Sequence, residues 1–453
     1  MARAKKEAAL TPEERLQAAL VPDWERPYKL PENWCWTTVG AINQYEGISA
    51  DPTKAKNETF ELYSVPSSAD NYPEIVLGAD IGSAKQSVKK GDVLLCKINP
   101  RINRVWKVSK YTDHSLLASS EWIVIRNSRL ISNYLMWCLR SPYFRGYMLS
   151  NVSGVGGSLM RAQPKFVQGY PIPVPPLAEQ QRIVDRIESL FAKLDEAKEK
   201  AQAVVDSFET RKAAILHKAF TGELTAKWRE EHGVGMESWE HHQFSDLCAI
   251  VRGGSPRPAG DPRYYDGNIP FMKVADITRN DSPYVSKVEY SIKEEGLKKT
   301  RMVEANTLLL TNSGATLGVP AITTIRTTFN DGIAAFIGLD IDSLLFYYYF
   351  WTSKTAFLRS INMGAAQPNL NTKLIGEVEI DVPQTTERIE IARILNALLT
   401  KEQQAKESAE AVLDQIDLMK KSILARAFHG ELGTNDPSEE SAVELLKEII
   451  RRG

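Results

Sequence analysis

Two stretches of the chain place apolar residues at alternating steps of four and three residues. In the first stretch these positions are Ile183, Ile187, Leu190, Leu194, Ala197, Ala201, Val204 and Phe208. In the second they are Ile391, Leu395, Leu398, Glu402, Ala405, Ala409, Val412 and Ile416, with Glu402 as a polar interruption that would fix the register. This spacing keeps one narrow apolar stripe on a helix, so each stretch predicts a long helix with a coiled-coil seam.

The two helical stretches are copies of one another. Residues 174–224 align without a gap onto residues 382–432, and the run Ala219-Phe220-x-Gly222-Glu223-Leu224 recurs as Ala427-Phe428-x-Gly430-Glu431-Leu432. Proline precedes each stretch and glycine closes it, as at ordinary helix boundaries. One such seam alone would indicate a core helix. Two matching seams in one chain favour an antiparallel pair formed within the chain.

Two globular blocks, residues 30–170 and 239–379, precede the two helices. Each combines short apolar runs, such as residues 92–95 and 307–310, with turns rich in Gly, Pro, Asn and Ser. Each also contains one aromatic-rich helical segment, which is more typical of a core than of a base-stacking surface. The predicted fold class is α+β, with two globular domains that alternate with two long helices forming an antiparallel coiled coil.

Composition narrows the class of protein without naming a partner. Hydrophobic residues make up 43% and charged residues 25% of the chain, which is typical of globular domains that fold without disulfides or metals. The 56 basic residues balance the 57 acidic ones, so overall charge neither indicates nor excludes nucleic-acid binding. The four cysteines lie far apart, which fits a reducing cytosol. Since no apolar run is long enough for a bilayer, we expect a soluble cytoplasmic protein without a membrane partner.

The motifs of the expected catalytic classes are missing from the sequence. It has no phosphate-binding Gly-x-x-x-x-Gly-Lys-Ser/Thr loop, and Asn99-Pro100-Arg101 is not the Asn/Asp-Pro-Pro-aromatic motif of amino-methyltransferases. The glycine-rich run at residues 154–157 follows no clear strand, and the six histidines lack the spacing of helical metal ligands. We therefore expect a binding protein. A fused methyltransferase or nuclease, and a coiled-coil scaffold without a DNA role, stay open as alternatives.

Polar loops in both blocks are candidates for reading DNA. Recognition needs Arg or Lys for phosphates and guanine edges, and Asn, Gln or Ser for adenine edges and the backbone. In the first block the predicted DNA-binding residues are Lys97, Asn99, Arg101, Asn103, Arg104, Ser158 and Arg161. In the second block they are Arg252, Ser255, Arg257, Arg263, Tyr264, Lys273, Asn312, Ser313, Gln367 and Asn369. For any single residue a solvated side chain is the simpler interpretation, so the prediction rests on the clusters.

Several motifs point to a known family. They are Pro173-Val174-Pro175-Pro176-Leu177-Ala178-Glu179-Gln180, the helix end at residues 216–224, the run 253–271, and residues 308–318 with their Thr-Asn-Ser-Gly-Ala-Thr core. With the duplicated helices, these motifs resemble the specificity subunit of type I restriction-modification systems over nearly the whole chain from Leu30. The second helix departs from the pattern, because it begins with Gln384-Thr385-Thr386-Glu387-Arg388.

The resemblance implies a non-catalytic DNA-recognition subunit. Its parts would be an N-terminal extension (1–29), a first target-recognition domain (30–172), a first spacer helix (173–232), a second target-recognition domain (233–381), a second spacer helix (382–432) and a C-terminal amphipathic tail (433–453). Each domain would contact half of a split double-stranded DNA target, and the helices would set the gap. Two modification subunits would bring S-adenosylmethionine, and restriction or motor subunits would bring ATP and Mg²⁺, so no cofactor is expected in this chain. A modification-only system is the alternative within the family.

Overall fold

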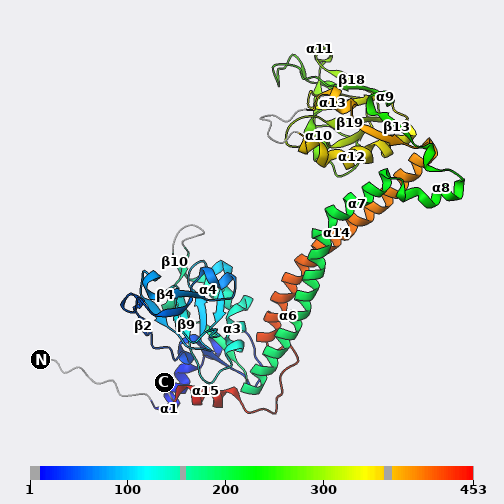
Figure 1. Ribbon diagram of the computed structural model, residues 1–453. Coiled ribbons are helices and arrows are strands. Elements are labelled where there is room, and N and C mark those ends of the chain that lie inside the picture. The colour runs from blue at the N-terminus through cyan, green and yellow to red at the C-terminus, as the bar shows by residue number, and fades with distance from the viewer. Residues whose placement is uncertain (1–10, 154–159, 362–369, 452–453) are drawn as a thin grey trace. The chain divides into compact units, whose positions relative to one another are not determined.

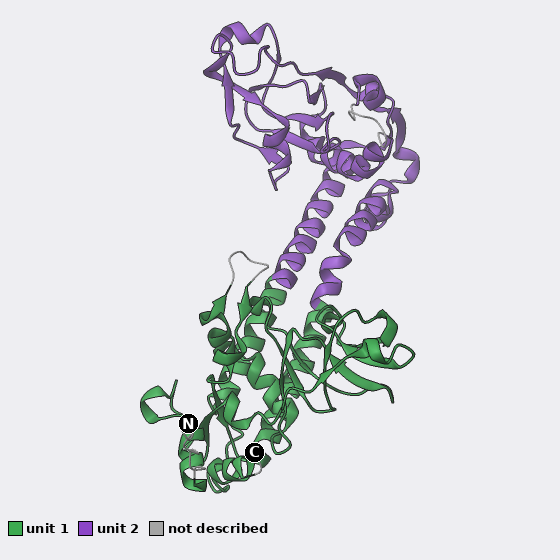
Figure 2. Ribbon diagram, turned by 90° about the vertical axis from the view of Figure 1, so that its left-hand side faces the viewer, with its two compact units in different colours: residues 1–200, 411–453 green, residues 201–410 purple. Residues whose placement is uncertain are grey.

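The computed structural model describes residues 11–153, 160–361 and 370–451, and it divides into two compact units (Figure 2). Unit 1 comprises residues 1–200 and 411–453, and unit 2 comprises residues 201–410. Each unit combines one globular domain with a stretch of both long helices (Figures 1 and 2). Within the described ranges no helix is both long and apolar enough to cross a membrane.

The globular part of unit 1 is built on short strands and short helices, including α2 (Val39–Ile42) and α5 (Pro164–Val167). One sheet has the order β2-β5-β8-β3-β4, a second has the order β7-β6-β9, and β1 pairs antiparallel with β12. The strands are β1 (Cys35–Thr38), β2 (Ser49–Ala50), β3 (Thr59–Tyr63), β4 (Glu74–Leu77), β5 (Lys85–Ser87), β6 (Val93–Cys96), β7 (Val105–Lys107), β8 (Ser115–Ala118), β9 (Trp122–Ile125), β10 (Val152–Ser153), β11 (Arg161–Ala162) and β12 (Pro171–Val174). The helices α3 (Ser132–Arg140) and α4 (Pro142–Ser150) follow the sheets along the chain.

Strand β6 is the centre of unit 1 because both of its faces are buried. Val93 and Leu95 lie in the same core cluster as residues of α3, whereas Leu94 and Cys96 lie in a second cluster with Trp106 and other residues. Successive side chains of a strand point to opposite faces, so an uninterrupted apolar run is what such a strand requires. The loop that follows β6 therefore starts from a rigid base.

The two ends of the chain complete unit 1. Thr11 caps α1 (Pro12–Ala19) through a capping box with Glu14. The tail forms α15 (Ala442–Ile450), whose Leu446 and Ile449 are buried in the core of unit 1. In the structure its apolar face packs against its own chain.

Unit 2 has the same plan, with one sheet of five strands and one of four. Its sheets have the orders β14-β22-β19-β20-β16 and β17-β15-β21-β18, and β13 pairs antiparallel with β23. The strands are β13 (Glu240–Gln243), β14 (Ala249–Arg252), β15 (Tyr265–Met272), β16 (Tyr284–Val285), β17 (Tyr290–Ile292), β18 (Arg301–Val303), β19 (Thr307–Thr311), β20 (Pro320–Thr323), β21 (Thr327–Phe329), β22 (Ile333–Ile337) and β23 (Glu379–Val382). Strand β19 corresponds to β6: Leu308 and Leu310 share a cluster with the aromatic helix α12 (Leu344–Ser360), and Leu309 lies in another.

The long helices pair in antiparallel fashion within each unit. In unit 1, Lys420 of α14 (Thr385–Phe428) forms an ion pair with Asp195 of α6 (Leu177–Asp206). In unit 2, Lys406 lies over the Phe208 ring, with 4.9 Å from Nζ to the ring centroid. Residue numbers fall along α14 as they rise along its partner, and Figure 1 shows α14 beside α7 (Phe208–Phe220). Two predicted seam residues are exceptions, since Val412 is 40% exposed and Ala405 is also exposed.

Glu402 and a break near Ser207 are two features of the helix pair that involve the same arginine. Glu402, the predicted register-fixing residue, accepts a hydrogen bond from Arg211 Nε at 2.7 Å. The first helical stretch is interrupted at Ser207, between α6 and α7, which the apolar pattern does not reveal. Arg211 also donates to the main-chain oxygen of Val204, and the Ser207 hydroxyl donates to that of Ala203. Side chains that take main-chain oxygens of the preceding turn compete with the regular helix, which accounts for the break.

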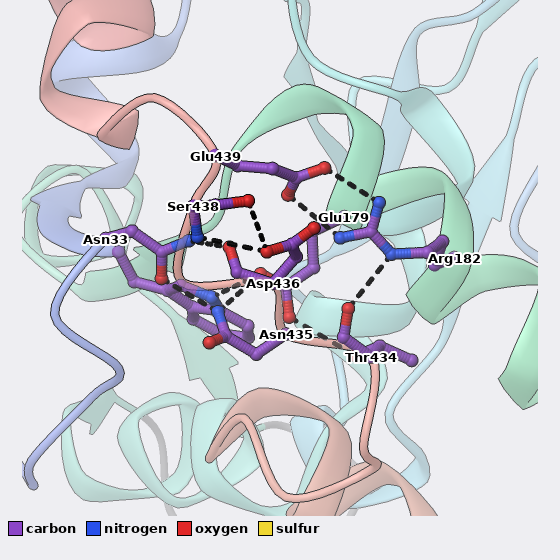
Figure 3. A network of polar contacts seen from close by, with 9 residues as sticks. Asn33, Glu179, Arg182, Thr434, Asn435, Asp436, Ser438 and Glu439 are labelled. Carbon is purple, nitrogen blue, oxygen red and sulfur yellow. Dashed lines mark hydrogen bonds and ion pairs between the residues drawn. The ribbon is translucent and has the colours of Figure 1, made fainter.

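In each unit, a buried glutamate near the start of one long helix accepts hydrogen bonds from the segment that follows the other long helix. In unit 1, Glu179 is fully buried and accepts hydrogen bonds from Trp34 Nε1 at 2.7 Å, Asn435 Nδ2 at 2.9 Å and Thr434 Oγ1 at 3.3 Å (Figure 3). Beside it, Arg182 forms a two-pronged ion pair with Glu439, with both N–O distances 2.8 Å. These bonds tie the segment after α14 to the start of α6.

Glu387 has the same role in unit 2. It is fully buried and accepts from Thr225 Oγ1 and Arg229 Nη1, both at 2.7 Å, and from Trp239 Nε1 at 3.1 Å. The donors come from the segment that follows α7, including α8 (Ala226–His232). The duplication seen in the sequence therefore extends to these buried hydrogen bonds, because a tryptophan indole donates to the glutamate in each unit.

Candidate nucleic-acid interface

In unit 1 the polar loop after β6 forms a tight turn that displays Arg101 and Ile102. The turn contains a short 3₁₀ helix, Pro100–Ile102, flanked by Asn99 with φ 48° and Asn103 with φ 53°. Asparagine is among the few side chains that adopt this left-handed conformation readily. Pro100 is buried beneath the turn, whereas Arg101 and Ile102 are exposed.

Hydrogen bonds from neighbouring elements hold this turn in place. Asn103 Nδ2 donates to the main-chain oxygen of Arg140, the last residue of α3, at 2.9 Å. Arg145 of α4 donates to the main-chain oxygen of Arg101. The side-chain amide nitrogen of Asn103, a predicted DNA-binding residue, thus already donates a hydrogen bond within the domain. Asn103 positions the turn, and Arg101 stands at its exposed face.

The structure brings together two loops that the sequence predicted separately. The Asn99 amide donates to the Met160 oxygen at 2.9 Å, and the Ala162 amide donates to the Lys97 oxygen at 2.8 Å. This places Arg161 beside the turn, where its Nη1 lies 3.2 Å from Glu121 Oε2. Arg104 is half-buried at the far end of the turn. Ser158 lies outside the described residues.

In unit 2 the predicted loop 252–257 is anchored on Asp331. Arg252 Nε donates to the main-chain oxygen of Asp331 at 2.7 Å, and Ser255 Oγ donates to its Oδ1 at 2.6 Å. Arg257 Nη2 lies 3.4 Å from Oδ2. Burial by itself would raise the pKa of Asp331, but the bond from Ser255 and the charges of Arg257 and Arg252 outweigh it, so the pKa is lowered. Asp331 is therefore ionised.

Asp331 lies on the wall of a cavity of about 300 Å³ that contains three of the predicted residues. Ser255, Arg257 and Lys273 line it, with Tyr265, Phe271, Tyr290, Asn330 and Asp331 among the other lining residues. Lys273 Nζ lies 3.1 Å from the centroid of the Tyr290 ring. This is the position where predicted residues from separate parts of the second block meet.

Other predicted residues of unit 2 lie elsewhere. Arg263 is not among the residues that line this cavity. Its Nη2 lies 2.6 Å from Asp261 Oδ2, its guanidinium lies over the ring of Tyr264, and its hydrogen bond lowers the pKa of Asp261 to about 2. Asn312 is fully buried, and its main-chain amide donates to the main-chain oxygen of Gly332 at 2.9 Å.

Asn312 is therefore placed inside the unit and not on its surface. Among the described residues its side-chain amide has no hydrogen-bond partner. Ser313 is half-buried next to it. Gln367 and Asn369 lie outside the described residues.

Comparison with known proteins decides what this arrangement belongs to. Residues 38–205 and 236–411, more than half of the chain, match the family described as the type I restriction modification DNA specificity domain. The chain belongs to this family. It is 23% identical to the EcoKI specificity subunit of Escherichia coli over 72% of the chain and 73% of that protein. It is 30% identical to the MjaIX specificity subunit of Methanocaldococcus jannaschii, over 35% of the chain and 38% of that protein.

Solved structures show the same fold for this specificity subunit. The HsdS subunit from Thermoanaerobacter tengcongensis superposes with a TM-score of 0.66 at 21% identity, covering 90% of the chain and 100% of that structure. A structure from a study of complex assembly and conformational transition of the type I system gives a TM-score of 0.69 at 21% identity, with the same coverage. The predicted α+β class with long paired helices is confirmed.

Family membership also decides between the functional alternatives. The specificity subunit is the non-catalytic DNA-recognition component of a type I restriction-modification system, so the fused-enzyme and scaffold alternatives fall away. It works on DNA together with other subunits of that system. Which of its loop residues contact DNA stays a prediction.

Reasoning from the sequence missed two features of the candidate interface. Asp331 was overlooked because DNA recognition was expected from basic and amide side chains, although the turn sequence Asn330-Asp331-Gly332 was a usable signal. Ile102 was overlooked because an apolar residue inside a basic loop is usually assigned to the core. In the structure it is 54% exposed.

Proposed function

We propose that each unit recognises one half of a bipartite double-stranded DNA target and that the paired helices set the unread gap. The observation that carries this proposal is the duplication: each unit has a central buried strand, β6 or β19, followed by a polar loop, and the same buried glutamate near the start of a long helix. Two similar binding units in one chain fit a target with two separate halves.

Within each unit the residues expected to act on DNA have different roles. Arg101, Lys97 and Arg161 in unit 1, and Arg257 and Lys273 in unit 2, supply positive charge for phosphates or guanine edges. Recognition of base edges would take place mostly through the major groove, because only there does each base pair present a distinct pattern. Ser255 and the main-chain groups of the loops would orient the duplex.

The paired helices are long enough to act as a spacer. Helix α14 has 44 residues, which corresponds to about 66 Å at 1.5 Å per residue. That length equals roughly 19 base pairs at 3.4 Å per step. A rigid antiparallel pair would hold the distance between two recognition sites constant.

The chemistry would come from partner subunits. We expect two modification subunits to dock on this chain and to carry S-adenosylmethionine, with the target adenines flipped into their pockets. Restriction or motor subunits would carry ATP and Mg²⁺. No cofactor is assigned to this chain. The alternative is a system that only methylates, and it would show the same DNA recognition.

The proposal is tested by sequencing modified bases in host DNA with this gene intact and with it deleted, leaving neighbouring genes untouched. Loss of adenine methylation at one gapped, two-part motif on deletion is the expected result. An unchanged methylation pattern in a strain that expresses all subunits would contradict it.

The spacer role has its own test. Removing residues 194–200 from α6 together with residues 415–421 from α14 takes one matched heptad from each helix of unit 1, according to the pairing of Asp195 with Lys420. The gap should shorten by about three base pairs, since seven helical residues span roughly 10 Å. Removing only one of the two heptads is the control and should abolish methylation by breaking the register. An unaltered gap in the matched deletion would exclude the spacer role.

A further inference from the structure

Asp331 presents a carboxylate on a cavity wall whose other charged side chains are Arg257, Lys273 and Asp266. Its side chain is 43% exposed, so it is accessible from the cavity. It lies in the turn between β21 (Thr327–Phe329) and β22 (Ile333–Ile337), two strands of different sheets that fix its position from both sides. The carboxylate is therefore held in a defined place and not on a free-moving loop.

A carboxylate in a surface that faces DNA needs a specific reason. Phosphates repel it, and the basic residues around it serve phosphates and guanine better. The groups on a base that favour a carboxylate are exocyclic amines, because an ionised carboxylate accepts hydrogen bonds and donates none. In the major groove these amines are N4 of cytosine and N6 of adenine.

The hydrogen bonds of Asp331 leave room for such a donor. Ser255 occupies one position on Oδ1 at 2.6 Å, and Arg257 lies 3.4 Å from Oδ2. A carboxylate has about four acceptor positions. The lowered pKa keeps the group ionised, so it discriminates between amines and the keto oxygens of guanine and thymine.

We propose that Asp331 is a specificity-determining residue that accepts a hydrogen bond from the exocyclic amine of a cytosine or adenine in the half-site read by unit 2. This inference rests on the proposed function. Arg257 and Lys273 flank the carboxylate and hold the adjacent backbone or a guanine edge. Asp331 thus selects a base while its neighbours supply affinity.

The competing role for Asp331 is structural, because it also anchors the loop 252–257. A matched variant separates the two roles. Tyr265 donates from its hydroxyl to the Pro256 oxygen at 2.9 Å and so holds the same loop without touching the carboxylate. Tyr265→Phe loosens the loop and keeps Asp331, whereas Asp331→Asn keeps the shape of the side chain and adds a donor. Glu304→Gln, which breaks the exposed pair of Glu304 with Arg326, controls for loss of one negative charge in unit 2.

The experiment uses the full chain with its modification subunits and reads the methylated motif by sequencing modified bases. For Asp331→Asn we expect one position of one half-site to accept guanine or thymine in addition to the original amine-bearing base, with preference falling about tenfold. The altered position should lie in the same half as any position altered by Arg257→Ala. Glu304→Gln should keep the wild-type motif and its extent of methylation, whereas Tyr265→Phe, which loosens the cavity wall, should lower methylation without admitting guanine or thymine at that position.

Three results would overturn the inference. The motif could stay unchanged in Asp331→Asn, or Asp331→Asn and Tyr265→Phe could both lower methylation without altering the motif. If Asp331→Asn does not fold, the wild-type complex is tested on duplexes in which each amine-bearing base of the half-site is replaced in turn by its analogue without the amine. At least one duplex should then bind about tenfold more weakly, and equal binding to all of them is the third contrary result. A wild-type complex that gives no gapped motif at all would instead contradict the proposed function.

Discussion

Replacing Glu387 with glutamine removes a negative charge from a site where Arg229 is buried. Glu387 is fully buried and Arg229 is 7% exposed, and the two are joined by a 2.7 Å hydrogen bond. Glutamine keeps the shape of the side chain and can still accept from Thr225 through its one amide oxygen, but its amide nitrogen cannot accept from Trp239 Nε1. The change therefore removes the charge and the acceptor of the Trp239 indole while it keeps the size of the side chain.

The expected loss follows from the burial of Arg229. Breaking one partner of a buried ion pair costs about 3–5 kcal/mol, because the remaining charge is left without compensation. That is a large part of the total stability of a domain, which is about 5–15 kcal/mol. Glu179→Gln in unit 1 should cost less, about 1–2 kcal/mol, because the donors to Glu179 are the neutral side chains of Trp34, Asn435 and Thr434.

Hydrogen–deuterium exchange resolved by peptide measures the two units separately. In Glu387→Gln, protection in α8 and β13 should fall by roughly two to four orders of magnitude, with unit 1 unchanged. The double variant Arg229→Met/Glu387→Gln should recover at least half of the loss, because no buried charge remains unpaired. A loss below about 1 kcal/mol for Glu387→Gln, or a double variant as unstable as the single one, would refute this reasoning.

Three further predictions concern unit 1. Arg101→Ala should weaken DNA binding by the complex and reduce the slope of log affinity against log salt by about one, measured by fluorescence anisotropy; an unchanged slope removes Arg101 from the phosphate contacts. Asn103→Ala should lower stability by about 1–3 kcal/mol in thermal unfolding, because it loses the hydrogen bond to Arg140 and forces alanine into a left-handed conformation. Asn103→Gly should lower stability less, since glycine adopts that conformation readily. Equal losses in the two variants would contradict the conformational argument. Burial by itself would raise the pKa of Glu61, but hydrogen bonds from Tyr63 and from the segment 111–112 outweigh burial and hold the pKa below 4.5. The ionised Glu61 therefore stabilises the fold fully above pH 4.5, and this stabilisation is lost as the pH falls through the pKa of Glu61 in the folded state. Near-ultraviolet circular dichroism should show this acid transition in the wild type and not in Glu61→Gln, and identical transitions in both would contradict it.

The parts of the fold that were predictable from the sequence depend on local periodicity. The seam positions Ile183, Ile187, Ile391 and Leu395 are buried as predicted, because a repeat of four and three residues leaves one face for a partner. The interruption at Ser207 was not predictable, since it arises from side-chain hydrogen bonds to main-chain oxygens and leaves the apolar spacing unchanged.

The candidate interface was predictable only as a set of loops. Arg101, Arg257 and Lys273 stand at a surface or cavity, as the clusters suggested. Asn103 and Asn312 carry the same polarity in the sequence, yet one caps α3 and the other is buried. Whether a loop amide faces water or its own domain is decided by contacts with residues distant in the chain, such as Arg140 and Gly332, and no local pattern encodes these.

The two units share the buried glutamate at the start of a long helix and differ in the side chains that they would present to DNA. Glu179 and Glu387 each accept an indole hydrogen bond near the start of a long helix, so the duplicated scaffold places both domains on the helices in the same way. The surfaces are chemically unlike: unit 1 presents Arg101 and Ile102 on a rigid turn, and unit 2 presents the Asp331 cavity. Arg101 in unit 1 and the Asp331 carboxylate in unit 2 favour different base edges, so we expect the two units to prefer different half-sites. The proposed function and the Asp331 inference together therefore predict two unlike half-sites, with the duplication expressed in their fixed spacing and not in their sequence.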